Sequence, residues 1–395
     1  MADEDRARAA IAGAERFLNA WHGSPRPRER LEGLVPALDA SERGDRYGEG
    51  ERIERLERRT AELLGKEAAV FMPSGTMAQQ IALRIWCDRR GRRTVAFHPT
   101  CHLELHEEKA YEWLHGLHAT LVGDPNRLVT LADLERLREP VAALLLELPQ
   151  RELGGRLPAW GDLVAQTGWA RGKGIALHLD GARLWEAQPF YARPHAEIAG
   201  LFDSVYVSFY KGLGGLAGAV LAGDAALVAE ARVWQRRHGG NLVTMFPYVV
   251  AAESALDERL ALMPVHLEHA RALAAELATV DGLEVMPDPP QTPLFHVLLR
   301  GERGRLVDAA LSVAEERKVF LFADPSSTSS PRWQRHEVMV GDVTLELDPD
   351  EVRELYAEVL ARASSPRVAP PAPRAGARRR SSRRDDRSSV RESRP

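Results

Sequence analysis

Short apolar runs alternate with amphipathic stretches between residues 45 and 265. A run of four to eight apolar residues indicates a buried strand, and apolar residues spaced three or four apart indicate a helix. On this basis we expect strands at 68–72, 94–97, 141–148, 175–179, 204–209 and 217–222. Helices are expected at 49–65, 77–87, 102–114 and 157–172. The alternation predicts an α/β fold in which helices cover both faces of a mostly parallel sheet.

The sequence divides into four predicted parts. Residues 1–44 form a helical or irregular N-terminal arm, and residues 45–265 form the large domain. A small α+β domain is expected at 266–363, with helices at 266–278, 306–318 and 349–363 and strands at 294–299 and 338–345. The tail at 364–395 is rich in Arg, Ser and Pro and has very few apolar residues, so we expect it to be disordered.

Charge and the distribution of apolar residues limit the classes of partner. The chain has a formal net charge of −4, and the tail from Ser364 contributes ten arginines against three acidic residues. The rest of the chain is therefore acidic, which argues against nucleic acid. No apolar run is long enough to predict a membrane span, and the charged first residues do not form a secretory signal. Cys87 and Cys101 show no metal or redox spacing, so we expect a cytoplasmic enzyme with reduced thiols.

Lys211 is the first candidate for chemistry. Only five of the 53 basic residues are lysines, and Lys211 follows a predicted strand and precedes several glycines. Burial in such surroundings lowers the pKa of a lysine, and Schiff-base formation requires a neutral amine. Ser208, three residues earlier, is a candidate phosphate contact. A lysine in a surface loop is the simpler alternative, which the scarcity of lysine disfavours.

Two other turns also follow predicted strands. Asp180 comes at the sheet edge where α/β proteins bind ligands. A carboxylate there can pair with a protonated pyridine nitrogen or can cap a helix, and the segment by itself leaves both possibilities open. Ser74, Gly75 and Thr76 lie between a strand and a helix, where free N–H groups and hydroxyls suit a phosphate. A helix cap is again the plain alternative.

In their order and spacing, these segments resemble the threonine aldolase/β-eliminating lyase family of type I enzymes that use pyridoxal 5'-phosphate (PLP). The matching stretches are 47–49, 63–69, 73–78, 178–184 and 211–214. The resemblance implies a type I PLP-dependent transferase-like fold, an amino-acid substrate, and a homodimer or homotetramer.

The resemblance also implies a role for each candidate residue. Lys211 would form the Schiff base, Asp180 would pair with the pyridine nitrogen, and His102 would stack on the ring. Arg183 would lie near the cofactor and the substrate carboxylate. The phosphate would be held by Ser74, Gly75 and Thr76, with Ser208 as a further contact. His102 and His106 have the spacing of a metal-binding pair, but the nearby sequence offers nothing to complete a ligand set.

The sequence departs from the family where the substrate binds. Glu147 matches a family glutamate, but Gln150 stands where the family has a histidine near the substrate hydroxyl. A glutamine cannot act as a general base. The family's C-terminal arginine for the substrate carboxylate is not in its place, and Arg332 and Arg335 lie a few residues upstream. A glycine-rich segment that carries a phosphate-binding arginine in the family is replaced by 239–244.

The resemblance therefore implies a lyase that cleaves a 3-hydroxy amino acid to glycine and an aldehyde. Lys211 and His102 would be catalytic. The candidate substrate contacts are Arg183, Glu147, Gln150 and Arg335. The departures leave two alternatives open: another PLP reaction, such as β-elimination, racemisation or transamination, and a PLP-fold protein that binds a ligand without turnover.

Overall fold

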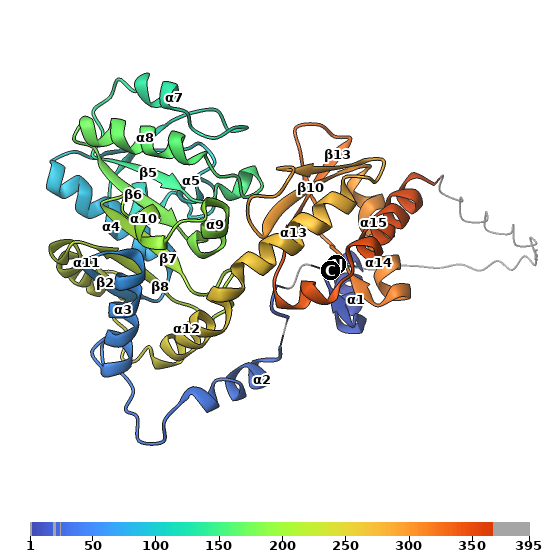
Figure 1. Cartoon of the computed structure of the whole chain (residues 1–395), viewed down its shortest axis with the longest axis horizontal. Coiled ribbons are helices and arrows are strands. Elements are labelled where there is room, and N and C mark those ends of the chain that lie inside the picture. Colours follow the sequence, from blue (N-terminus) through green and yellow to red (C-terminus); the bar gives the residue numbers. More distant parts are fainter. Residues whose placement is uncertain (1, 19–20, 24, 366–395) are drawn as a thin grey trace, which may run out of the picture. The chain divides into compact units, whose positions relative to one another are not determined.

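The computed structural model describes residues 2–18, 21–23 and 25–365 (Figure 1). Apart from Ser364 and Ser365, the tail that the sequence predicts to be disordered lies outside the described residues. Over the described ranges, no helix combines the length and the apolar character needed to cross a bilayer.

Seven strands form the central sheet, in the order β2-β8-β7-β6-β5-β3-β4. Their bounds are β2 (Ala68–Met72), β3 (Thr94–Phe97), β4 (His118–Leu121), β5 (Ala143–Glu147), β6 (Ala176–Gly181), β7 (Ser204–Ser208) and β8 (Ala219–Gly223). β8 runs antiparallel to its neighbours β2 and β7, and the neighbouring strands from β7 to β4 are parallel. The mostly parallel sheet is therefore confirmed, and β4 is an additional strand that the sequence did not predict.

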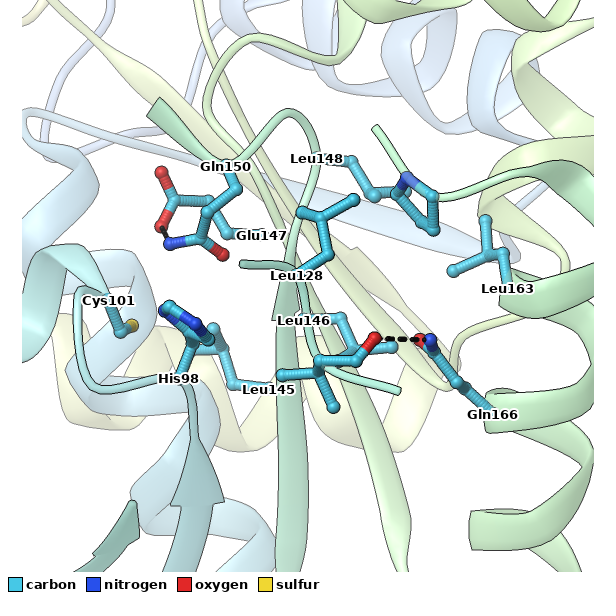
Figure 2. Close-up of a pocket in the computed structure, with 12 residues that line it drawn as sticks. His98, Cys101, Leu128, Leu145, Leu146, Glu147, Leu148, Gln150, Leu163 and Gln166 are labelled. Carbon is cyan, nitrogen blue, oxygen red and sulfur yellow. Dashed lines mark hydrogen bonds between the residues drawn. The ribbon is translucent and has the colours of Figure 1, made fainter. Parts of the chain in front are cut away.

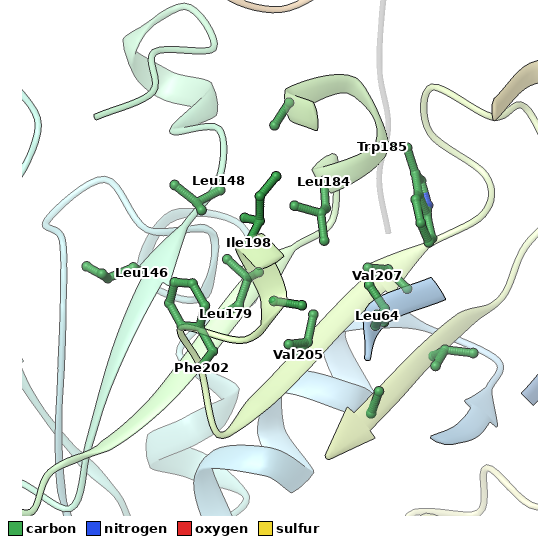
Figure 3. Packing of buried hydrophobic residues seen from close by; sticks show 14 of the residues in the cluster. Leu64, Leu146, Leu148, Leu179, Leu184, Trp185, Ile198, Phe202, Val205 and Val207 are labelled. Atoms are coloured by element: carbon green, nitrogen blue, oxygen red, sulfur yellow. The ribbon is translucent and has the colours of Figure 1, made fainter. Parts of the chain in front are cut away.

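Apolar side chains cover both faces of this sheet. Along β5, Leu144 and Leu146 belong to one buried cluster and Leu145 to another, because successive side chains of a strand point to opposite faces. In the first cluster, Leu179 and Val205 of the sheet pack with side chains from the covering helices (Figure 3). Burial on both faces explains why the strands are continuous apolar runs in the sequence.

Helices fill the connections between these strands. α3 (Glu51–Leu64) ends at Gly65, whose left-handed backbone with φ of 59° is typical of a helix end. α4 (Gly75–Arg90) follows β2 directly. The remaining helices of this region are α5 (His102–Leu105), α6 (Ala110–Trp113), α7 (Leu131–Glu135), α8 (Trp160–Gly172), α9 (Leu184–Tyr191), α10 (His195–Ala199), α11 (Ala225–Arg237) and α12 (Phe246–Arg259).

A second sheet, in the order β12-β13-β10-β9, forms in the C-terminal part. The elements of this part are α13 (Met263–Leu277), β9 (Leu283–Met286), β10 (Leu294–Arg300), α14 (Arg303–Arg317), β12 (Ser326–Ser327), β13 (Trp333–Met339) and α15 (Pro349–Ser364). The start of the chain joins this part. β1 (Arg16–Phe17) pairs in parallel with β11 (Val319–Phe320), and α1 (Ala2–Gly13) contacts α14. α2 (Pro27–Glu32) follows, and the exact domain boundaries stay a prediction.

The single helix expected at 102–114 is wrong. Two short helices, α5 and α6, stand in its place. Glu108 and Lys109 separate them with left-handed backbone, at φ of 49° and 54°. This conformation ends an α-helix, because residues other than glycine adopt it only locally.

The strand expected at 338–345 is also wrong. It lies earlier, as β13, and a 3-10 turn at Asp342–Glu346 follows it. Gln334, His336 and Val338 occupy the buried positions of β13. Because two of these three are polar, the alternation that signals a strand is hidden in the sequence.

His178 of β6 makes the stability of the fold sensitive to acid. It is fully buried with Nδ1 2.8 Å from Ser204 Oγ, and burial lowers its pKa to about 4. An unfolded histidine has a pKa of about 6.5, so below that pH the unfolded state binds the extra proton. We therefore expect about 3 kcal/mol of unfolding free energy to be lost as the pH falls from about 6.5 to about 4.

Denaturant unfolding at a series of pH values measures this loss, and His178→Gln should remove it. His118→Gln in β4 is the control, because His118 is exposed and its replacement should leave the pH dependence unchanged. An H178Q protein that loses as much stability in acid as the wild type would contradict the assignment.

Candidate active site

Three neighbouring strands end at the same edge of the central sheet and carry candidate residues. Glu147 ends β5 and lies beside Asp180 of β6, and Lys211 follows β7. All three side chains line one pocket. The pocket is also lined by Thr76, His102 and Arg183. The structure thus brings these predicted residues together, as expected where the carboxyl ends of parallel strands meet.

Lys211 contributes a buried amine to this pocket. Burial is the largest influence on the amine and, together with the charge of Arg183, lowers its pKa against the opposing charges of Asp180 and Glu147. The ring of Tyr210 lies 6.0 Å from Nζ. A buried lysine with a lowered pKa supplies the neutral amine that attack on a carbonyl carbon needs.

Asp180 is held in place by two neutral hydrogen-bond donors. Gln79 Nε2 donates to Oδ2 at 2.8 Å, and the backbone N–H of Ala182 donates to Oδ1 at 3.1 Å. These bonds fix the direction in which the carboxylate faces. The sequence did not single out Gln79, although it follows Thr76 by three residues and so shares a face of α4 with it.

The start of α4 has the features of an anion site. Ser74 caps the helix and accepts a hydrogen bond from Met77 N at 3.3 Å. A Cβ at Gly75 would lie 1.9 Å from Tyr206 Oη, so glycine alone fits this position. Thr76 lines the pocket directly after it. An anion at this point meets free N–H groups and the positive end of the helix dipole.

His102 and the buried Glu107 form a hydrogen-bonded pair. His102 Nδ1 lies 3.0 Å from Glu107 Oε1, and Glu107 also accepts a bond from Gln80 Nε2 at 2.7 Å. The carboxylate takes the N–H at Nδ1, which leaves Nε2 of neutral His102 as a proton acceptor. His106 instead bonds to Glu152 Oε1 at 3.0 Å. In the part of the chain that the structure describes, no three His, Cys, Asp or Glu side chains are grouped for a metal.

Glu147 lines both this pocket and a second cavity, which Figure 2 shows. Gln150 lines this second cavity with His98 and Cys101, and it donates from Nε2 to Glu147 Oε2 at 3.0 Å. The backbone N–H of Arg151 donates to Glu147 Oε1 at 3.1 Å. Burial, and then the charge of Asp180, raise the pKa of Glu147 to about 8. Both influences favour the protonated form of this carboxyl group.

Two other predicted residues are not among those that line the pocket. Ser208 Oγ donates to the carbonyl oxygen of Ala182 at 2.6 Å. Arg335 Nη2 lies 3.1 Å from Glu152 Oε2, and its Nη1 donates to the Glu152 carbonyl oxygen at 3.3 Å. The phosphate contact of Ser208 and the substrate contact of Arg335 stay predictions.

Two arginines line the pocket beside the lysine. Arg183 Nη1 lies 3.1 Å from both carboxylate oxygens of Glu186, and its buried Nε has no hydrogen-bond partner among the described residues. Arg151 forms a two-bond pair with Glu337, at 2.9 and 3.0 Å. The sequence did not single out Arg151, because its partner lies 186 residues away.

The residues present fit PLP, which carries an aldehyde, a pyridine nitrogen and a phosphate. The pocket offers each of these groups a partner: the buried amine of Lys211, the fixed carboxylate of Asp180, and the helix start at Gly75, where a side chain would clash. His102 borders the same space.

Comparison with known proteins bears on the same residues. The model of the beta-eliminating lyase family matches residues 37–299, which include Glu147, Asp180, Lys211 and the strands that precede them. The chain belongs to the beta-eliminating lyase family.

Several relatives of this beta-eliminating lyase have names that specify a reaction. Low-specificity L-threonine aldolase 1 of Arabidopsis thaliana is 30% identical over 285 residues, which cover 69% of this chain and 79% of that protein. Low specificity L-threonine aldolase of Saccharomyces cerevisiae is 28% identical over 294 residues, or 68% and 71%. A solved structure described as a "putative L-allo-threonine aldolase", from Listeria monocytogenes EGD-E, has a TM-score of 0.87 and 39% identity, and covers 91% of this chain and 99% of that one.

Proposed function

We propose that this beta-eliminating lyase is a PLP-dependent aldolase that cleaves a 3-hydroxy amino acid, of the threonine type, to glycine and an aldehyde. The observation that carries the proposal is the convergence of the buried amine of Lys211, the carboxylate of Asp180 and the start of α4 in one pocket. The threonine aldolase names of its relatives point to the same reaction.

Each part of the pocket has a task in holding the cofactor. Lys211 would hold it covalently, Asp180 would face its ring nitrogen, and the N–H groups after Ser74 would receive its phosphate. PLP, when bound, draws electrons away from the α-carbon of an amino acid, so that a bond to this carbon can break. Gln79 and the Ala182 N–H keep the Asp180 carboxylate in one orientation while this happens.

Arg183 is the side chain best suited to bind the substrate carboxylate. Nη1 of Arg183 bonds to Glu186 and Nη2 contacts Met339 Sδ, whereas Nε is buried without a partner among the described residues. An unpaired buried donor is costly, and a carboxylate oxygen would satisfy it. Glu186 stays paired with Nη1 and fixes the guanidinium plane.

His102 is proposed to take the proton from the substrate's 3-hydroxyl when the Cα–Cβ bond breaks. Its Nδ1 is committed to Glu107, so Nε2 carries the free electron pair. Gln150 cannot replace it, because its amide donates to Glu147 and has no basic nitrogen. Glu147 is a weaker candidate, since burial favours its protonated form and its two oxygens already accept bonds from Gln150 and the Arg151 N–H.

The relatives' chemistry can be tested directly on the purified, PLP-loaded protein. With L-threonine or L-allo-threonine we expect acetaldehyde and glycine in equal amounts. A 2-oxo acid and ammonia, with no aldehyde, would identify an elimination instead and overturn the proposal.

The same assay tests His102. His102→Asn keeps a polar side chain without the basic Nε2, and we expect kcat to fall by about 10²- to 10⁴-fold. His106→Gln is the matched control, because His106 lies on the next turn with its ring centroid 5.1 Å from that of His102 and bonds to Glu152. Equal losses in both variants would remove His102 from the mechanism.

By resemblance to type I PLP enzymes, we also infer a homodimer or homotetramer that acts in the cytoplasm.

A further inference from the structure

The loop after Lys211 is held by side chains from outside it. Each of four consecutive carbonyl oxygens in this loop accepts a hydrogen bond from a basic side chain. The pairs are His22 Nε2 with Gly212 O (2.7 Å), Arg259 Nη1 with Leu213 O (3.1 Å), and Arg30 Nη2 with Gly214 O (3.0 Å) and Gly215 O (3.1 Å). Two of these donors, His22 and Arg30, come from the N-terminal arm, to which the sequence assigned no role.

His22 is the donor nearest to Lys211. A carbonyl oxygen only accepts hydrogen bonds, so Nε2 of His22 must carry the proton that it shares with Gly212. The other nitrogen, Nδ1, lies 3.0 Å from Asp342 Oδ2. A Cβ at Gly214 would lie 2.4 Å from His22 Cδ2, so the loop also packs directly on the imidazole ring.

Both backbone polar groups of Gly212, the residue after Lys211, are therefore held by side chains. Glu186 Oε1 accepts the Gly212 N–H at 3.1 Å, opposite the bond from His22 to the Gly212 carbonyl. The same Glu186 carboxylate pairs with Arg183. A displacement of His22 would thus affect both Lys211 and Arg183.

Trp21, the residue before His22, lies against Arg183. The guanidinium carbon of Arg183 is 4.8 Å from the centre of the Trp21 ring, within the range of a cation–π interaction. The backbone of Trp21 has a left-handed φ of 46°, and its carbonyl oxygen accepts a bond from Val343 N at 3.1 Å. This conformation directs the ring and the next side chain towards different partners.

The arm that carries Trp21 and His22 is fastened to the C-terminal part of the chain. Leu18 is fully buried there, and its N–H donates to Phe320 O at 3.0 Å. Asp342, the partner of His22, also pairs with Arg259 Nε at 2.7 Å. The segment that contacts the Lys211 loop and Arg183 is therefore itself held by the C-terminal part of the chain.

We propose that residues 21–23, which we call the N-terminal strap, position the active site: His22 fixes the backbone of Gly212, the residue after Lys211, and Trp21 orients the guanidinium of Arg183. The assignment rests on the proposed function of Lys211 and Arg183. It makes Trp21 and His22 positioning residues, since Trp21 acts through Arg183 and His22 acts through the backbone next to Lys211.

Three variants of His22 in the PLP-bound protein test the first half. His22→Phe keeps a ring against Gly214 without donors, His22→Ala removes the ring, and His22→Gln keeps an N–H for the Gly212 carbonyl. For Phe and Ala we expect amide hydrogen exchange of peptide 210–216 to be at least about tenfold faster and kcat to be about 10²-fold lower. The Gln variant should recover most of the slow exchange and most of kcat. If only one of the Phe and Ala variants folds, that variant decides the result.

Trp21 is tested by the balance between KM and kcat. Trp21→Ala should raise the KM for the amino acid about tenfold, because the Arg183 guanidinium loses the ring that holds it, whereas Trp21→Phe should stay within about threefold of the wild type. A fall in kcat at unchanged KM in Trp21→Ala would overturn this half of the proposal.

Arg16→Ala is the matched control for loss of anchorage alone. Arg16 ties the same arm to Glu351 by two bonds of 2.6 Å and touches neither the loop nor Arg183. It should lower the melting temperature and leave the exchange of 210–216 unchanged. The proposal for the strap would be contradicted by equal exchange rates in R16A and H22F, or by an H22F loop that is as protected from exchange as the wild-type loop. Hydrogen exchange can be measured even if the protein releases no aldehyde, so a failure of the proposed function can be told apart from a failure of the proposal for the strap.

Discussion

Lys211→Ala is expected to lower aldehyde release by about 10⁴-fold or more and to abolish the visible absorbance of covalently bound PLP. Lys211 is the buried amine of the pocket, and no side chain near it can replace that amine, since Arg183 and Arg151 keep their protons. Spectra of the purified protein with added PLP, and acetaldehyde release from L-threonine, measure both effects.

Lys66→Ala is the matched control for this change. Lys66 is also largely buried, its pKa is also lowered by burial, and its Nζ donates to Phe202 O at 2.6 Å outside the pocket. It should keep the absorbance and the activity. If Lys66→Ala lost the absorbance and Lys211→Ala retained it, the assignment of the cofactor lysine would be wrong.

Asp180→Asn is expected to have the second-largest effect, a fall in kcat of about 10²- to 10³-fold. The substitution keeps the shape of the side chain but removes the negative charge that would hold a proton on the ring nitrogen, so the cofactor would draw electrons less strongly. Steady-state kinetics with L-threonine give kcat, and dialysis followed by absorbance measures how much PLP is retained.

Asp203→Asn is the control for the loss of a carboxylate from the same sheet. Asp203 precedes β7 and accepts a bond from Leu177 N at 2.8 Å, at the opposite ends of the strands from the pocket. It should reduce stability and leave kcat unchanged. An Asp180→Asn protein whose kcat stays within twofold of the wild type would exclude a charge pair at the ring nitrogen.

The sequence predicted best what lies along one strand and at its end. β2 and β3 have the expected bounds, because the apolar runs that predict them are buried on both faces of the sheet and end where the strands end. Lys211, Asp180 and Thr76 were predicted to meet for the same reason, since a parallel sheet collects the carboxyl ends of its strands at one edge.

The rest of the site depends on contacts that leave no local pattern. Gln79 is a polar residue within α4 and Glu107 lies between α5 and α6, and only their buried partners show why they are there. β13 was misplaced because Gln334 and His336 fill its buried positions. The strap has neither periodicity nor a motif, and it reaches the loop after Lys211 across 190 residues of sequence.

The pairing of β1 with β11 also sets an order of events during synthesis. Residues 16 and 17 leave the ribosome about three hundred residues before their partners, residues 319 and 320. The central sheet can form in the meantime, because its last strand ends at Gly223. A nascent chain can therefore hold its lysine and aspartate at the sheet edge before the strap has an anchor, and the site is completed only after residues 319 and 320 have been made.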